Sequence, residues 1–238
     1  MQSERHPVDK SGLAIERMFS AVAPRYDLLN RLLSANLDQR WRRQAAAALK
    51  LPNGAPVLDT CAGTGDQALA LRKRTSTVLA ADFSVSMLEI ASKKFRRTQA
   101  PPPAGFASDT LHLPLASGTL GAVTVSFGLR NVVDLDAALH EMYRVLRHNG
   151  ETAILEFALP RSTLLRKPYL IYFRSILPRI GGWLSPRGSA YTYLPESVMQ
   201  FPQREDFIRR MEDAGFRDAT WQDLTGGIVC LYTGRRDS

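Results

Sequence analysis

The sequence predicts an α/β fold in which a mostly parallel β-sheet carries helices on both faces. From Ala55 onward, short apolar runs that suit buried strands alternate with helical stretches, the order expected of a covered parallel sheet. The chain has 238 residues, which is enough for one sizeable core. Hydrophobic residues make up 45% and charged residues 23%, so we expect one ordered globular domain over 1–238.

The first fifty residues are expected to be helical. Apolar side chains recur there at three- and four-residue steps, the period of an amphipathic helix. They are Leu13, Met18, Phe19, Val22, Tyr26, Leu29, Leu32 and Leu33. Pro24 interrupts the pattern and is expected to start a second helix, and a third should run from Asp38 to about Lys50.

Residues 51–157 carry five expected strands with helices between them. The strands are Ala55–Asp59, Thr77–Asp82, Phe106–Ala107, Leu120–Phe127 and Thr152–Phe157. The helices are Gln67–Lys73, Ser84–Arg97 and Leu135–Arg147. Ser84 is suited to cap the second of these helices, and Gly150 is expected to help end the third.

The C-terminal part is expected to complete the sheet. After an irregular segment over 158–203, a helix is predicted for Arg204–Ala214 and strands for Phe216–Gln222 and Ile228–Thr233. The short Gly226-Gly227 link between these strands predicts that they pair as an antiparallel hairpin.

Charge and cysteine content bear on compartment and partners. The formal net charge of +8 fits either nucleic acid or an anionic membrane surface and does not choose between them. The start MQSERHPVDK is polar, and no stretch approaches the ~20 apolar residues of a spanning helix. Only two cysteines occur, Cys61 and Cys230, so a reducing cytoplasmic location is expected.

Ligands of open parallel sheets bind beyond the carboxyl ends of the strands, so the residues that follow each strand are the candidate site residues. After the first strand, Gly63, Gly65 and Ala68 match the G-x-G-x-x-A dinucleotide fingerprint. Asp82 follows Gly63 by 19 residues (82 − 63), as that fingerprint requires. A nicotinamide-dependent dehydrogenase is therefore one interpretation of this turn.

The charges around the turn favour a different ligand. Asp59 and Asp66 flank it with no Lys or Arg between them, and carboxylates there would repel the pyrophosphate of a dinucleotide. S-adenosylmethionine carries an ammonium and a sulfonium and no phosphate, so it suits an acidic turn. The purely structural alternative is that both aspartates only cap the following helix.

Further polar residues follow the next strands. Asp82 can accept hydrogen bonds from a ribose diol, and Asp109 with Thr110 can reach the amino group of adenine. Ser126 ends the fourth strand and should lie beside the methionine part of the donor. Acids at three successive strand ends are a more specific signal than any one of them.

Recognisable motifs lie along nearly the whole chain. They are FSAVAPRYDLLNRLLS (19–34), RWRR (40–43), VLDTCAGTGD (57–66), SFGLRNVVD (126–134), RVLRHNGE (144–151), LEF (155–157), AYTYLPESV (190–198) and LTGGIV (224–229). Together they resemble the C-methyltransferases of menaquinone and ubiquinone biosynthesis (the MenG/UbiE type), and SFGLRNVVD is the most specific piece. The family usually has glycine at the position of Ala62, another small residue at Cys61 and often alanine at Thr110.

The resemblance implies a Rossmann-like fold of class I S-adenosylmethionine-dependent methyltransferases, with a seven-stranded, mostly parallel sheet and an antiparallel last strand. It implies that S-adenosylmethionine is the methyl donor. The implied donor-binding residues are Gly63, Thr64, Gly65, Asp82, Asp109, Thr110 and Ser126. Residues 51–157 would bind the donor, 158–203 the acceptor, 1–50 would cover the site, and 204–238 would close the domain.

The implied reaction is methyl transfer to a ring carbon of a prenylated quinol, in the first place demethylmenaquinol to menaquinol. A benzoquinol of the ubiquinone pathway is the alternative. The resemblance makes Arg130 and Asn131 the expected catalytic pair. An arginine stays protonated near neutral pH, so Arg130 is expected to stabilise the phenolate or orient a water, while Asn131 holds the ring oxygen.

Other classes fit the residues less well. No Asp/Asn-Pro-Pro-aromatic run and no cysteine follow the fourth strand, so a nucleic-acid methyltransferase is not favoured and no nucleic-acid partner is expected. No acid cluster lies near Ser126, as a metal-dependent O-methyltransferase would require. The histidines lack metal-ligand spacing, so no metal is expected. A donor-binding module without catalysis would show the same spacings.

The segment between Phe157 and Pro195 contains no acidic residue. Its basic residues are Arg161, Arg166, Lys167, Arg174, Arg179 and Arg187, and they alternate with aliphatic and aromatic side chains. This pattern fits peripheral contact with an anionic membrane, RNA binding, or a helical cover over the acceptor pocket. Because a prenylated quinol resides in the bilayer, membrane contact and a cover are compatible.

Overall fold

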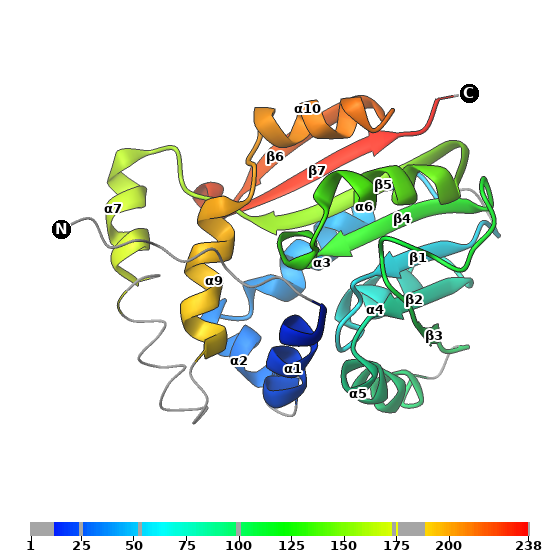
Figure 1. Cartoon of the computed structure of the whole chain (residues 1–238), viewed down its shortest axis with the longest axis horizontal. Coiled ribbons are helices and arrows are strands. Elements are labelled where there is room, and N and C mark those ends of the chain that lie inside the picture. The colour runs from blue at the N-terminus through cyan, green and yellow to red at the C-terminus, as the bar shows by residue number, and fades with distance from the viewer. Residues whose placement is uncertain are drawn as a thin grey trace.

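The computed structural model describes residues 12–23, 26–51, 54–98, 101–172, 175 and 189–237 (Figure 1). Seven strands form one sheet in the order β3-β2-β1-β4-β5-β7-β6. The strands are β1 Val57–Thr60, β2 Val78–Asp82, β3 Ala104–Ala107, β4 Leu120–Ser126, β5 Leu146–Phe157, β6 Arg217–Leu224 and β7 Val229–Arg235. β7 runs antiparallel to both of its neighbours, and the other pairs are parallel, so the predicted fold class is confirmed.

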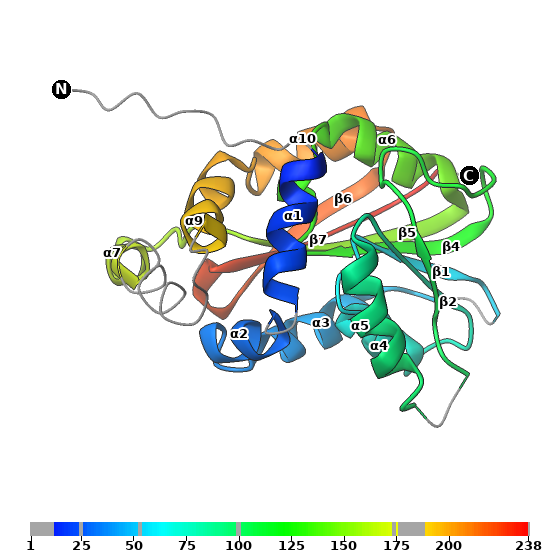
Figure 2. The ribbon, with the colours of Figure 1, turned by 60° about the horizontal axis from the view of Figure 1, so that its bottom comes forward.

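Helices cover both faces of this sheet. They are α1 Gly12–Val22, α2 Tyr26–Leu33, α3 Leu37–Ala48, α4 Asp66–Arg72, α5 Val85–Phe95, α6 Leu135–Val145, α7 Thr163–Ile171, α9 Ser189–Gln200 and α10 Glu205–Asp213. The carboxyl ends of the parallel strands point toward α1, α2 and α9 (Figures 1 and 2). The N-terminal helices and α9 therefore gather at the edge where the site is expected.

The core consists of two buried layers, one on each face of the sheet. Alternate residues of one strand enter different layers, so Val123 packs with α6 and α10 while Ala122 packs with α3 and α4. This alternation is the two-residue period of a strand that is covered on both faces. Because β4 is buried along its whole length, its sequence LGAVTVS shows no polar face.

Two local predictions are confirmed. Ser84 caps α5, since its Oγ accepts a hydrogen bond from the backbone N–H of Met87 at 3.4 Å. β6 and β7 pair antiparallel, and the turn between them places Thr225, Gly226 and Gly227 at φ values of 49°, 70° and 86°. Glycine tolerates this left-handed conformation, which explains the paired glycines.

The prediction for Gly150 is wrong. α6 ends at Val145 and β5 begins at Leu146, so Gly150 lies inside the strand and does not end the helix. A Cβ at this position would lie 2.9 Å from the carbonyl oxygen of Arg147, so the close backbone approach requires glycine. Pro24 and the basic residues Arg174, Arg179 and Arg187 lie outside the described residues.

None of the helices described is long and apolar enough to cross a membrane.

At Gly128, the loop after β4 packs against the loop after β1. A Cβ on Gly128 would overlap the Cβ of Cys61 and lie 3.1 Å from its Sγ and from Val125 Cγ1. Gly128 therefore allows the loops after β1 and β4 to pack without a gap, directly before the turn that carries Arg130.

We predict that Gly128→Ala destabilises the protein by about 1–3 kcal/mol, because an added methyl group forces packed neighbours apart. Urea denaturation should show a lower midpoint with an unchanged slope. Gly105→Ala is the matched control, since a Cβ there meets its nearest atoms at 3.9 Å, an ordinary contact distance. A Gly128→Ala midpoint equal to that of the wild type would contradict the packing described.

Candidate functional site

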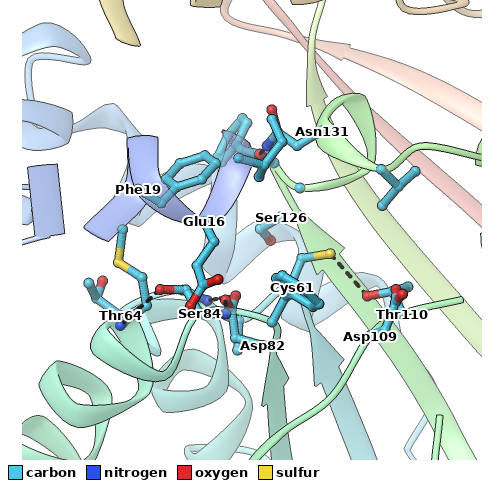
Figure 3. Close-up of a pocket in the computed structure, with 18 of the residues that line it drawn as sticks. Glu16, Phe19, Cys61, Thr64, Asp82, Ser84, Asp109, Thr110, Ser126 and Asn131 are labelled. Carbon is cyan, nitrogen blue, oxygen red and sulfur yellow. Dashed lines mark hydrogen bonds between the residues drawn. The ribbon is translucent and has the colours of Figure 1, made fainter. Parts of the chain in front are cut away.

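A cavity opens at the carboxyl ends of the parallel strands, beside β1 where the strand order reverses (Figure 3). Most of the predicted donor-binding residues line it. They are Gly63, Thr64, Asp82, Asp109, Thr110 and Ser126, and Asn131 lines it as well. Glu16 and Phe19 of α1 reach over the cavity from the opposite side. We call this the first cavity.

The glycine turn after β1 is held to the end of β2 by Asp82. The backbone N–H of Gly63 donates to Asp82 Oδ2 at 2.7 Å, and that of Ser84 donates to Oδ1 at 2.8 Å. Burial raises the pKa of Asp82, and these two hydrogen bonds oppose the shift. Two fixed donors therefore orient the carboxylate, and each oxygen keeps acceptor capacity for a ligand.

Gly65 has a structural place in this turn. It adopts φ 82° and a Cβ there would lie 2.5 Å from the Phe95 ring. Unlike Gly63, it is absent from the lining of the first cavity. Gly65 therefore shapes the turn and lets α5 pack closely, and its predicted contact with the donor finds no direct geometric support.

The position of Asp59 differs from the prediction. Asp59 is fully buried in β1, away from the cavity lining, where its Oδ1 accepts a hydrogen bond from Thr124 Oγ1 at 3.0 Å. Burial raises its pKa to about 7. The prediction that Asp59 faces the ligand as a repelling charge is therefore wrong, because its side chain is buried on a helix-covered face of the sheet, beside Thr124 of β4.

Asp66 does line the cavity, but a cation neutralises it. Lys94 Nζ lies 2.5 Å from Asp66 Oδ1 and 2.7 Å from Asp27 Oδ2. Burial alone would raise the pKa of Asp66, but its contacts with Lys94 outweigh this and the net pKa is lowered. The same cluster includes Thr64, whose hydroxyl donates to Asp27 Oδ1 at 2.5 Å. This link fastens α2 to the glycine turn.

The loop after β3 carries Asp109 and Thr110. Thr110 Oγ1 lies 2.7 Å from Thr60 Oγ1 and 3.2 Å from Cys61 Sγ, so its hydroxyl is engaged within the protein (Figure 3). Asp109 Oδ1 accepts from the backbone N–H of Leu111 at 2.9 Å, while the carboxylate stays partly exposed. The hydroxyl of Thr110 therefore supports the loop, and a ligand would meet Asp109 or the backbone.

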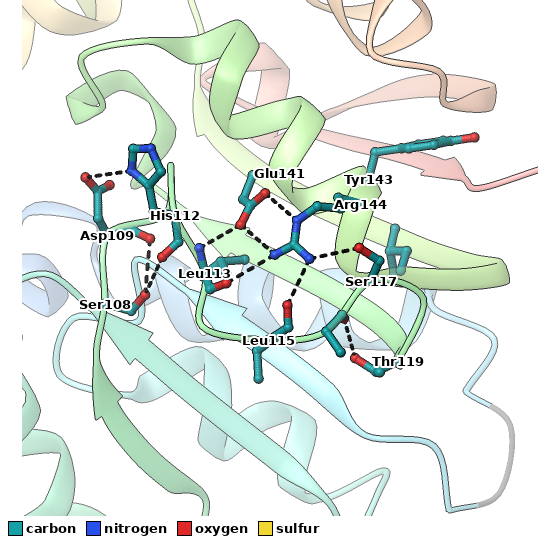
Figure 4. Close-up of polar contacts among 12 residues, drawn as sticks. Ser108, Asp109, His112, Leu113, Leu115, Ser117, Thr119, Glu141, Tyr143 and Arg144 are labelled. Carbon is teal, nitrogen blue, oxygen red and sulfur yellow. Dashed lines mark hydrogen bonds and ion pairs between the residues drawn. The ribbon is translucent and has the colours of Figure 1, made fainter.

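A partly exposed ion pair between Glu141 and Arg144 fastens this loop to α6. Glu141 Oε1 accepts from the backbone N–H of Leu113 and from Arg144 Nη2, both at 2.7 Å (Figure 4). Arg144 Nη2 also donates to the Leu113 carbonyl oxygen at 3.1 Å. His112 points outward with 85% of its side chain exposed, as expected of a solvated loop histidine.

Two buried polar atoms on the β4 side lack partners. Ser126 Oγ and Asn131 Oδ1 have no hydrogen bond to any described residue, and both residues line the first cavity. A buried polar group without a partner costs about 1–3 kcal/mol, so a ligand or water that bonds to it is favoured. The end of β4 and the turn after it therefore present two buried polar atoms that can form hydrogen bonds with a ligand.

A second, mainly apolar cavity adjoins the first. Its lining includes Trp41, Phe127, Phe157, Tyr169, Tyr172, Tyr193 and Arg130. Phe19, Tyr26, Arg42 and Phe127 line both cavities, so the two spaces meet at these side chains. The pair predicted to act together is therefore divided, with Asn131 facing the first cavity and Arg130 the second.

Arg130 is held in a buried ion pair with Glu156. Its Nη1 lies 3.1 Å from Glu156 Oε2, and its backbone N–H donates to Glu156 Oε1 at 3.3 Å. Nη1 also donates to the Phe127 carbonyl oxygen. Burial raises the pKa of Glu156, and Arg130 opposes this shift. Arg130 Nε has no partner among the described residues.

Sequence reasoning missed several of these residues. Trp41, Glu156 and Tyr193 lie in the motifs RWRR, LEF and AYTYLPESV, so the resemblance contained a signal for each. Asp27 lies in FSAVAPRYDLLNRLLS, but nothing local indicates its contact with Thr64, which is 37 residues away. Contacts between residues so far apart in the sequence become visible only in the folded structure.

Comparison with known proteins agrees with this arrangement. Residues 7–236 match the model of the ubiE/COQ5 methyltransferase family. The "Ubiquinone/menaquinone biosynthesis C-methyltransferase UbiE" of Geotalea uraniireducens is 42% identical over 95% of this chain and 98% of its own length. The "Demethylmenaquinone methyltransferase" of Deinococcus radiodurans is 42% identical over 94% of this chain and 92% of its own length.

Solved structures support the fold. A "SAM dependent methyltransferase" from Aquifex aeolicus has a TM-score of 0.63 at 17% identity, over 88% of this chain and 97% of its own. The "[4+2]-Cyclase SpnF" has a TM-score of 0.66 at 16% identity, over 95% and 97%. Since a cyclase shares the fold, the fold alone does not determine the reaction. The match over nearly all of the sequence does decide the family, and this chain belongs to the ubiE/COQ5 methyltransferases.

Proposed function

We propose that this methyltransferase transfers the methyl group of S-adenosylmethionine to a ring carbon of a prenylated quinol, converting demethylmenaquinol to menaquinol. The observation that carries the proposal is the junction of a polar cavity at the strand ends with an apolar, aromatic-lined cavity. The names of the relatives support it, since they refer to demethylmenaquinone or to both quinone pathways. A benzoquinol is the alternative acceptor.

The residues of the first cavity fit the donor. Asp82 would accept hydrogen bonds from the ribose hydroxyls, and the Asp109-Thr110 segment would meet the adenine. Ser126 Oγ, buried and without a partner among the described residues, would bond to the methionine part. When bound, S-adenosylmethionine supplies an electrophilic methyl group on a sulfonium. The protein's part is to hold it in line with the acceptor carbon.

The second cavity fits a flat aromatic acceptor. Phe127 and Phe157 pack with ring centroids 4.6 Å apart, and Trp41 meets Phe127 edge-on at 6.1 Å, so the walls suit a quinol ring. Tyr193 Oη is buried without a hydrogen-bond partner among the residues described and can bond to a ring oxygen. Burial raises its pKa to about 12, so this hydroxyl stays protonated.

Arg130 would stabilise the phenolate that forms when a ring hydroxyl loses its proton. Its ion pair with Glu156 fixes the guanidinium, and its free Nε can donate to the acceptor. Asn131, three residues after Gly128, would hold a ring oxygen near the junction of the cavities. An oriented guanidinium acts strongly in a site from which water is excluded.

The helices that cover the second cavity support a proposal of membrane contact. α2 and α7 line it with Leu29, Tyr169 and Tyr172, and they turn other apolar side chains outward. The exposed set is Leu28 64%, Leu32 59%, Leu164 82%, Leu165 47% and Ile171 61%. Arg161, Arg166 and Lys167 are exposed beside them. We propose that this α2–α7 surface meets an anionic bilayer, where a prenylated quinol resides.

The function is tested by turnover. Purified protein with S-adenosylmethionine and chemically reduced demethylmenaquinone should give menaquinol and S-adenosylhomocysteine in equal amounts, measured by liquid chromatography and mass spectrometry. The oxidised quinone should not react, because it lacks the electron-rich carbon. A parallel reaction with a reduced benzoquinone precursor decides between the two acceptors. Absence of methylation of either quinol would refute the proposal.

We predict that Arg130→Lys lowers kcat about 10²- to 10³-fold, because an ammonium cannot reproduce the oriented fork of donors. Donor binding, measured by calorimetry, should stay within about threefold of wild type, since Arg130 faces the second cavity. The lysine keeps a positive charge beside buried Glu156, which limits any loss of stability. Arg217→Lys, at an exposed position in β6, is the control. Wild-type turnover in Arg130→Lys would remove the role assigned to Arg130.

We predict that the protein sediments with phosphatidylglycerol vesicles and that Leu164→Glu weakens this binding about tenfold or more. The change removes an exposed leucine that would enter the bilayer and adds a negative charge that the anionic lipid repels. High salt should also weaken it. Val85→Glu is the matched control, because Val85 is 54% exposed on α5, away from this surface. Failure of the wild type to bind such vesicles would contradict the proposal.

A further inference from the structure

Arg42 is a buried cation at the junction of the two cavities. It lies on α3, only 7% of its surface is exposed, and it lines both spaces. Among the described residues that line the first cavity, it is the sole Lys or Arg. None of the roles proposed above for the cavity residues involves Arg42.

The guanidinium of Arg42 is poorly compensated within the protein. Its Nε is buried and has no hydrogen-bond partner among the described residues. The nearest carboxylate oxygen, Asp38 Oδ2, lies 3.9 Å from Nε and already accepts a hydrogen bond from Gln39. The Phe127 ring covers one side at 5.4 Å. A buried charge in this state favours an anionic ligand.

The other buried cations of the site are already paired. Lys94 contacts Asp27 and Asp66, and Arg130 contacts Glu156. An anion that enters the first cavity therefore finds its free donors at Arg42. Guanidinium and carboxylate match in geometry, because two parallel N–H groups can meet two oxygens.

The position of Arg42 indicates which anion this is. Asp82 and Asp109 follow β2 and β3, so the nucleoside lies on that side of β1. α3 packs against α4 and β5 on the other side, and the charge of Arg42 acts on Asp59 and Asp66 at the glycine turn. A donor with its nucleoside at Asp82 extends its amino-acid end across β1 toward Arg42.

We infer that Arg42 binds the α-carboxylate of the methyl donor and so fixes the amino-acid end of that ligand. The inference rests on the proposed function. With the nucleoside held at Asp82 and the carboxylate at Arg42, the sulfonium between them would lie beside Phe127, where the cavities meet. The same contact would compensate the buried charge only when the donor or its product is bound.

The test compares two ligands by calorimetry. S-adenosylhomocysteine carries the carboxylate, and its decarboxylated analogue lacks only that group. The wild type should prefer S-adenosylhomocysteine about 10- to 100-fold, the usual value of a charge-assisted pair. Arg42→Gln should lose this preference, with the affinity for the analogue within about threefold of wild type. Arg43→Gln, the same change at the exposed neighbour, should behave as wild type.

Other outcomes would overturn the inference. Equal loss of both ligands in Arg42→Gln would show that Arg42 only supports the cavity wall. Unchanged affinity for S-adenosylhomocysteine with a raised KM for the quinol would assign Arg42 to the acceptor. A wild type that binds neither ligand would instead refute the proposed function. Thermal unfolding without ligand checks folding, because Arg42→Gln also removes the positive charge that lies 3.9 Å from buried Asp38.

Discussion

Asp82 accepts hydrogen bonds from the backbone of two loops at once, the glycine turn after β1 and the start of α5 after β2. Parallel strands end at one edge of the sheet, but their loops would be independent without such a link. The carboxylate sets the separation of the two loops, and therefore the width of the first cavity. Two backbone donors orient its oxygens there, so its remaining acceptor capacity is directed into the cavity.

Buried charges around the site follow one pattern. Lys94 is balanced by Asp27 and Asp66, and Arg130 by Glu156, so these ions are held in fixed positions by partners from other elements. Fixed charges need no reorganisation when a ligand arrives, which is the basis of electrostatic preorganisation. Arg42 departs from this pattern because its nearest carboxylate oxygen, on Asp38, lies 3.9 Å away and its Nε has no hydrogen-bond partner among the described residues. A weakly paired ion that lines a cavity is a binding feature.

The positions of the strands, the hairpin and the gathering of the residues that follow the parallel strands could be predicted, because they depend on local sequence and on the rule that parallel strands end together. Asp82 and Ser126 are of this kind. The state of each charge could not be predicted, because it depends on partners that the fold brings from elsewhere. Asp59 was predicted to face the ligand, but its side chain is buried on a helix-covered face of the sheet. Asp66 was predicted to carry an unpaired charge, but Lys94 of α5 forms an ion pair with it. Gly150 was misassigned since glycine serves both helix ends and close strand contacts.

The interleaved order of the last strands has a consequence for how the chain can be assembled. β6 pairs only with β7, while β7 pairs with β5 on its other side, so β6 has no neighbour in the sheet until the strand after it has been made. During synthesis on the ribosome, the edge of β5 that pairs with β7 is therefore unpaired at first, and β6 has no strand to pair with. Once β7 has formed, Arg236 Nη1 donates to the carbonyl oxygens of Tyr143, Arg144 and Leu146, at 3.2, 3.0 and 2.7 Å. These bonds hold the chain after β7 against the end of α6 and the start of β5. An open edge of this kind attracts other chains, so nascent copies of this enzyme are exposed to mispairing for as long as translation of β7 is delayed.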